Sequence, residues 1–174
     1  MIADSSILIV FARINRIWLL NQLYGTIHVP PSVYNEIIEK GGKSGHRDVP
    51  NLKKAFSEGL IAVMDLDKNH KNLAEKLKIA NPNIDYAEAD VIALAAEQKT
   101  LALIDEHPAR IAAKLQGVKC IGSLGMLLLA FSKGFIKENE TKIILQTMLS
   151  ENFRISPLIV SEFHTEMERI KNKK

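Results

Sequence analysis

Short apolar segments alternate with stretches of helical periodicity along most of this chain, and this alternation restricts the fold more than any other feature. The segments expected to be strands are residues 1–3, 27–29, 60–64, 100–104 and 118–121. Between them, apolar residues recur at the spacing of an amphipathic helix. Strands alternating with helices of about ten residues indicate a parallel sheet with helices on both faces. We therefore predict an α/β fold with three layers, α/β/α, around a central parallel sheet.

The helical patterns predict where the chain leaves and re-enters the sheet. Helices are expected at residues 7–20, 32–40, 49–57, 71–78, 86–97, 109–115, 124–133, 141–150 and from 157 to the end. Gly41-Gly42 is expected to end the second of these helices. A chain of 174 residues suits one well-cored domain. We predict a single domain over residues 1–174, with a C-terminal helical extension from about residue 137.

Composition excludes several classes of protein. The single cysteine, Cys120, excludes an internal disulfide framework and a zinc site made of cysteines. No stretch reaches the roughly 18 apolar residues of a membrane span, and the first twelve residues do not resemble a secretory signal. We therefore expect a cytoplasmic protein that does not enter a membrane. The net charge of +3 does not identify a partner, although basic residues near the acids described next suit a phosphate backbone.

Two aspartates directly follow expected strands. Asp4 follows the segment 1–3, and Asp105 follows the segment 100–104. Ligands of open parallel sheets bind at the carboxyl ends of the strands, where the strand order reverses. A lone aspartate in this position often caps a helix, but Ser5 and Ser6 can cap the first helix equally well. We expect Asp4 and Asp105 to line one pocket.

Other acids lie near the starts of expected helices. Glu36 lies in the helix expected after Pro30-Pro31. An isolated glutamate in the first turns of a helix is usually exposed and interacts favourably with the helix dipole. Asp85 and Glu88 have the spacing of a capping box, which leaves Asp90 as the better candidate ligand because it precedes an almost wholly apolar run. Four clustered carboxylates would repel one another. A divalent cation removes that repulsion, and an all-oxygen set suits Mg²⁺ or Mn²⁺.

Four of these segments resemble the motifs of PIN domains. Asp4-Ser5-Ser6 resembles the family's opening motif, and Val29 to Glu36, which reads VPPSVYNE, resembles its second. Asp90-Val91-Ile92-Ala93 resembles the third motif, and Leu103 to Glu106 resembles the fourth. The later run 121–136 and residues 153–157 are similar to a branch of uncharacterised PIN-like proteins related to VapC toxins, so the resemblance spans nearly the whole chain.

The resemblance implies a homodimeric, Mg²⁺- or Mn²⁺-dependent ribonuclease that acts on RNA and is often the toxin partner of an antitoxin protein. It implies that Asp4, Glu36, Asp90 and Asp105 bind the metal and act in catalysis. Ser6 would hydrogen-bond near the metal, and Glu88 would support the site. The related proteins usually carry glutamate in the third motif, so the choice between Glu88 and Asp90 as its main ligand stays open.

Three functions are compatible with these residues. The first is an endoribonuclease in which Arg110 or Lys114 holds a flanking phosphate. The second is a non-catalytic PIN-like module that binds nucleic acid or regulates a partner without turnover. The third is a phospho-acceptor domain of receiver type, although receivers carry paired acids after their first strand and Asp4 is followed by two serines. We favour the ribonuclease.

Overall fold

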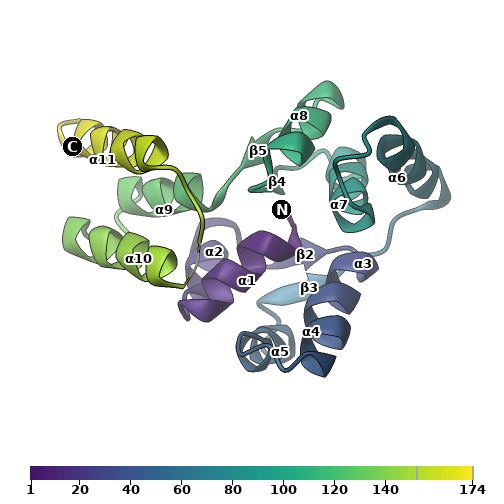
Figure 1. Cartoon of the computed structure of the whole chain (residues 1–174), viewed down its shortest axis with the longest axis horizontal. Coiled ribbons are helices and arrows are strands. Elements are labelled where there is room, and N and C mark those ends of the chain that lie inside the picture. Colours follow the sequence, from purple (N-terminus) through teal and green to yellow (C-terminus); the bar gives the residue numbers. More distant parts are fainter. Residues whose placement is uncertain (152, 174) are drawn as a thin grey trace.

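The computed structural model describes residues 1–151 and 153–173, and its strands form one five-stranded sheet (Figure 1). The strands are β1 (Ile2–Ala3), β2 (Ile27–Val29), β3 (Ile61–Val63), β4 (Ala102–Leu103) and β5 (Cys120–Ile121). Their order across the sheet is β3-β2-β1-β4-β5, and all neighbours are parallel. The predicted parallel sheet is therefore confirmed. Because β1 lies between β2 and β4, the strand order reverses beside the first strand.

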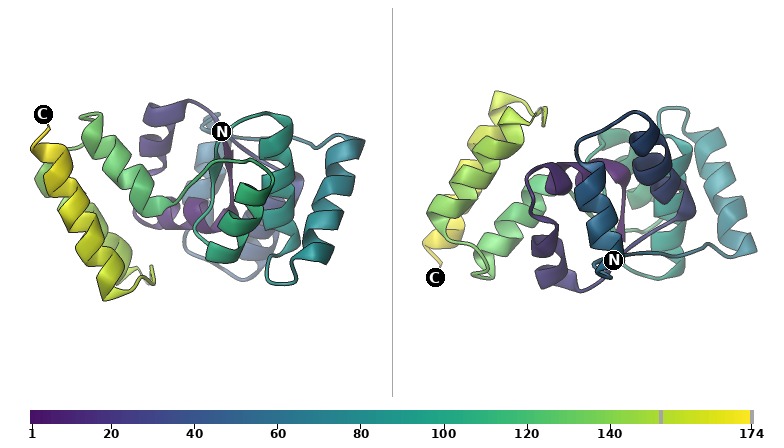
Figure 2. Two further views of the ribbon diagram at one scale, coloured as in Figure 1. Left: turned by 90° about the horizontal axis from the view of Figure 1, so that it is seen from above. Right: turned by 90° about the horizontal axis from the view of Figure 1, so that it is seen from below.

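Helices connect the strands and continue beyond the last one. They are α1 (Ser5–Arg13), α2 (Ile17–Tyr24), α3 (Pro31–Tyr34), the π-helical segment η1 (Asn35–Lys40), α4 (Gly41–Lys43), α5 (Val49–Ser57), α6 (Lys68–Ala80), α7 (Tyr86–Glu97), α8 (His107–Leu115), α9 (Ser123–Ser132), α10 (Glu138–Ser150) and α11 (Pro157–Lys171). Helix α1 contacts α5 and η1, whereas α7 contacts α6 and α8. The two groups cover the two faces of the sheet, as the further views show (Figure 2). The predicted three-layer α/β/α architecture is confirmed.

The core is centred on β1, β4 and α7. Ile2 and Ala3 of β1 are buried, as are Ala102 and Leu103 of β4. Helix α7 packs on both of these strands and is buried along most of its length, because it also carries α6 on its outer side. Burial on this scale stabilises the fold by roughly 1.5–3 kcal/mol for each large aliphatic side chain. The two central strands are therefore fixed firmly, together with the residues that follow them.

The last helices form the extension beyond the sheet. Helix α9 contacts α2 on the sheet domain and both α10 and α11 on its other side. In Figure 1 α10 and α11 lie at one end of the molecule and α6 at the other. None of the helices in the described parts of the chain is both long and apolar enough to cross a membrane.

Two expected helices differ from the structure. The pattern over residues 7–20 predicted one helix, but the chain breaks between α1 and α2, where Asn15 has a φ of +53° that no helix interior tolerates. The expected end at Gly41-Gly42 is also wrong, since α4 continues through Lys43. A Cβ on Gly41 would lie 3.2 Å from Val49 Cγ2, so this glycine allows close packing. The turn instead comes at Gly45, whose φ is +67°.

Candidate active site

Asp4 is held at the carboxyl end of the central strand β1. It occupies the N-cap position of α1 without making a side-chain capping bond, and only 3% of its surface is exposed. The hydroxyl of Ser6 donates to Asp4 Oδ2 at 2.9 Å, and the hydroxyl of Ser5 lies 3.5 Å from Oδ1. Burial raises the pKa of Asp4 from 3.8 to about 6, against the opposing effect of the Ser6 bond. The carboxylate is thus positioned by the serine hydroxyls and does not cap the helix.

Asp105 lies at the same edge of the sheet, at the end of the neighbouring strand. Ala3 is in register with Leu103, and the backbone N–H of Asp4 donates to the Leu103 carbonyl at 3.0 Å. Asp4 directly follows Ala3, the last residue of β1, and Asp105 lies two residues after Leu103, the last residue of β4. Both aspartates therefore emerge where the strand order reverses, which is the placement that the sequence predicted.

The N-terminus of α9 holds the Asp105 carboxylate on both oxygens. The Ser123 backbone N–H donates to Oδ1 at 2.8 Å, and the Ser123 hydroxyl donates to Oδ2 at 2.5 Å. Gly122 makes this approach possible, because a Cβ at that position would lie 2.7 Å from Asp105 Oδ1. Burial raises the pKa of Asp105, while the Ser123 bonds and the nearby charge of Arg110 lower it. Two carboxylate oxygens are therefore oriented before any ligand binds.

Glu88 is the acid of α7 that faces Asp4. The predicted capping box is confirmed: the Glu88 N–H donates to Asp85 Oδ1 at 2.8 Å, and the Asp85 N–H donates to Glu88 Oε2 at 2.7 Å. Burial raises the pKa of Glu88 to about 7, and the charges of Asp4, Asp85 and Glu106 raise it further. Glu88 is thus both a helix-capping residue and a member of the acidic group.

Glu36 joins this group from the other layer. It lies in η1, half-buried, on a π-helical turn of the kind that often occurs at functional sites. Burial is the main cause that raises its pKa, and the charge of Asp85 adds to the effect. Glu36 in turn raises the pKa of Asp4. Glu36, Glu88 and Asp4 therefore lie within one electrostatic neighbourhood, although they come from three different elements.

Asp90 shares the charge of Asp85 with this group but borders a different cleft. Two residues after Glu88, it lies on another face of α7 and lines a separate cleft with Lys71 of α6 and with Asp65. Burial raises the pKa of Asp90, and the Lys71 charge lowers it. A role for Asp90 as a ligand stays a prediction.

Two predicted basic residues lie on α8. Arg110 is exposed beside Asp105, with its Nη1 close to the Gly122 position. Lys114 lies one turn further along α8 and lines an adjoining groove with Ile111 and Lys119. Of the two, only Arg110 also borders the cleft that contains Asp105.

Several residues of the site were missed from the sequence. Asp85 and Glu106 both contribute negative charge around Glu88, and Ser123 with Gly122 orients Asp105. The Gly-Ser pair before an apolar helix was the available signal for Ser123, because the glycine leaves room for a neighbouring carboxylate and the serine hydroxyl can donate to it. Nothing in the sequence brought residue 123 near residue 105.

Within residues 1–151 and 153–173, one set of possible metal ligands has its ligand atoms close together, and it lies apart from this group. Asp67, His70 and Glu97 place their ligand atoms within 4.8 Å of one another. His70 Nδ1 is 2.8 Å from Asp67 Oδ1 and 3.4 Å from Glu97 Oε2. Glu97 ends α7 while Glu88 lies in its first turn, so the two sites are about 14 Å apart along the helix. Asp67 here accepts the capping bond of α6, which accounts for the cluster without a metal.

The donor set of the first group fits a hard divalent cation. Asp4, Glu36, Glu88 and Asp105 offer only carboxylate oxygens, the ligands that Mg²⁺ and Mn²⁺ prefer. Each has a pKa raised above its ordinary value, chiefly by burial. A bound cation would offset the cost of holding these charges together.

Comparison with known proteins gives one match that covers nearly the whole chain. The family model DUF3368, described as a PIN domain, matches residues 1–169. No curated protein matches the sequence. The matched range includes the sheet, all four acids of the group and most of the helical extension.

Proposed function

The chain belongs to the PIN-domain family, whose fold is of nuclease type, and on that premise we propose that it is a metal-dependent endoribonuclease. One observation carries the proposal. Buried acids with raised pKa values gather at the carboxyl edge of the sheet, where the strand order reverses. Such placement costs stability unless a ligand uses it.

We assign the metal-binding role to Asp4, Glu36, Glu88 and Asp105. Bound Mg²⁺ or Mn²⁺ supplies Lewis acidity for the hydrolysis of an RNA phosphodiester. Glu88 takes the place that the sequence gave to Asp90, because Glu88 shares the neighbourhood of Asp4 and Asp90 faces Lys71.

The chain's own residues hold the acids in position and set their protonation. Ser6 donates to Asp4 and Ser123 donates to Asp105, so two carboxylates are oriented by hydroxyl groups from separate helices. With pKa values of about 6 and about 7, Asp4 and Glu88 keep a share of their protons near neutral pH. Cation binding must release those protons, so affinity for the cation should rise with pH through this range.

The test compares Glu88→Gln with Asp90→Asn. Glutamine keeps an acceptor for the Asp85 N–H, so the capping box remains while the charge is lost. We expect Glu88→Gln to abolish cleavage of a labelled RNA pool in Mn²⁺ and Asp90→Asn to retain it. Cleavage by the parent should stop in EDTA.

The opposite pattern, with Asp90 essential and Glu88 dispensable, would overturn the assignment. Absence of cleavage by the parent in Mn²⁺, with RNA still bound, would favour the non-catalytic module instead.

The biological setting is proposed on the resemblance alone. We propose that the protein is a homodimer in the cytoplasm and the toxin of a toxin–antitoxin pair. Growth arrest on expression, relieved by the product of the adjacent upstream gene, would support the toxin role. Unimpaired growth with active nuclease would argue against it.

A further inference from the structure

A cleft opens directly beside the acidic group. Its volume is about 750 Å³, within the range of ligand sites. Ser6 and Asp105 lie at its acidic end, and α1, α8 and the start of α9 form three of its sides. The fourth side is the C-terminal wall, which comprises Glu151, Phe153, Arg154, Ile155, Ser156 and Ile159. The helical extension thus completes a cavity that begins at the proposed catalytic centre.

Three arginines line the cleft from three different elements. Arg13 comes from α1, Arg110 from α8 and Arg154 from the C-terminal wall. Arg154 is exposed, and neither a hydrogen bond nor an ion pair links it to any residue in ranges 1–151 and 153–173. A free guanidinium is suited to bind phosphate oxygens in a bidentate manner.

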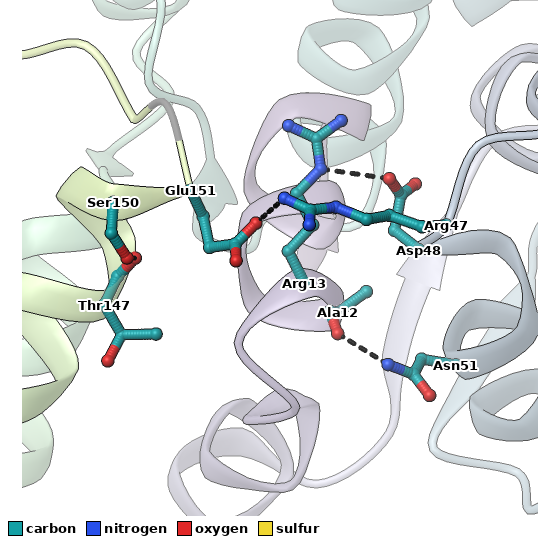
Figure 3. A network of polar contacts seen from close by, with 8 residues as sticks. All are labelled: Ala12, Arg13, Arg47, Asp48, Asn51, Thr147, Ser150 and Glu151. Atoms are coloured by element: carbon teal, nitrogen blue, oxygen red, sulfur yellow. Dashed lines mark hydrogen bonds and ion pairs between the residues drawn. The ribbon is translucent and has the colours of Figure 1, made fainter.

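Figure 3 shows the ion pairs made by two charged residues of the cleft, Arg13 and Glu151. Arg13 Nε donates to the buried Asp48 at 3.0 Å, which leaves its terminal nitrogens uncommitted among the described residues. Glu151, the acid of the C-terminal wall, is paired with Arg47 from the loop before α5. The charge of Glu151 is therefore offset, and negative charge stays concentrated at the end with Asp105 and Glu106.

Apolar side chains form a further part of the lining. Phe153 and Ile155 are partly buried against the core, and Val10 and Leu124 face the same cleft from α1 and α9. An aromatic face beside arginines is the combination that binds single-stranded nucleic acid, because bases stack on rings while phosphates bind cations. A base paired in a duplex has its faces covered by its neighbours and cannot stack in this way.

We propose that this cleft is a subsite for a single RNA strand, in which Arg154 binds a phosphate and Phe153 stacks on a base next to the cleaved bond. This inference rests on the proposed ribonuclease activity and adds a role for the C-terminal extension. The extension then makes the enzyme select single-stranded RNA, since it supplies both the guanidinium of Arg154 and the ring of Phe153.

The experiment measures binding of a fluorescein-labelled RNA of about ten nucleotides by anisotropy, in EDTA so that no cleavage occurs. Arg154→Ala should weaken binding about tenfold and reduce the slope of log K against log salt by about 0.7, the value for one phosphate on a single strand. Phe153→Leu keeps the apolar packing but removes the aromatic face, and should weaken binding about tenfold. The matched control is Arg169→Ala, an exposed arginine of α11 paired with Glu166, which should bind as the parent does.

Each outcome distinguishes the subsite from the nuclease. Weaker binding by both variants without any cleavage by the parent in Mn²⁺ would keep the subsite and reject the nuclease. Cleavage by the parent with unchanged binding by both variants would keep the nuclease and reject the subsite. Absence of RNA binding by the parent, or tighter binding of a duplex than of a single strand, would also overturn the subsite.

Discussion

Replacing the buried Asp4 carboxylate by an amide should change the stability of the metal-free protein in a way that depends on pH. The pKa of Asp4 is about 6 in the folded chain, against 3.8 for an ordinary aspartate. The folded state therefore binds this proton more tightly than the unfolded state. The free energy of unfolding must then fall as pH rises from about 4 to about 6. A shift of about two units corresponds to a loss of about 3 kcal/mol above pH 6.

Asp4→Asn removes this loss, because asparagine carries no charge at any pH. The amide also leaves donors without partners, at a cost of about 1–3 kcal/mol that does not change with pH. The informative quantity is therefore the difference between variant and parent at two pH values. Between about pH 4.5 and about pH 8 that difference should move by about 2 kcal/mol in favour of the variant.

Urea unfolding in EDTA, followed by circular dichroism, measures this difference. The matched control is Asp65→Asn, which makes the same substitution at an exposed position. If Asp4→Asn destabilises the protein by the same amount at both pH values, the carboxylate is a structural anchor and not a strained metal ligand.

Three further predictions follow from other contacts. Arg13→Ala leaves the buried Asp48 without its ion-pair partner and should lower the free energy of unfolding in urea by about 3–5 kcal/mol. Arg47→Ala breaks an exposed pair and should lower it by less than about 1 kcal/mol. Equal losses would show that burial does not set the strength of these pairs. Gly122→Ala places a Cβ 2.7 Å from Asp105 Oδ1, so the rate of RNA cleavage should fall about a hundredfold. The circular dichroism spectrum should stay unchanged. Full activity would show that the position of Asp105 is not critical. Mn²⁺ at about a hundredfold excess over its dissociation constant should stabilise the parent by about 2.7 kcal/mol, and thermal melts in which Asp4→Asn gains as much as the parent would exclude Asp4 as a ligand.

The sequence predicted the sheet and the two acids at its edge because both depend on local signals. Apolar runs marked the strands, and the aspartates followed them directly. Helices α5 and α7 begin and end where their patterns indicated, and the capping box of Asp85 and Glu88 formed as its spacing required. Each of these features is determined by residues within one or two turns of one another.

The orientation of α7 could not be read in the same way. A helix that is apolar on every side shows no preferred face in its periodicity, and α7 is buried between the sheet and α6. Which acid faces Asp4 was therefore decided by tertiary packing, which favours Glu88 over Asp90. The bonds from Ser123 to Asp105 likewise depend on a contact between separate elements.

The pairing of β1 with β4 also determines when the site comes into being as the chain folds. Ile2 pairs with Ala102, about a hundred residues further along, so the ends of a very long loop must meet before the centre of the sheet closes. Contacts of such long range form slowly, whereas neighbouring helices such as α6 and α7 can pair early. Asp4 has no Asp105 beside it until synthesis has continued through residue 105. A nascent chain that ends before residue 105 therefore lacks one of the four acids, so the proposed site is completed only late in synthesis.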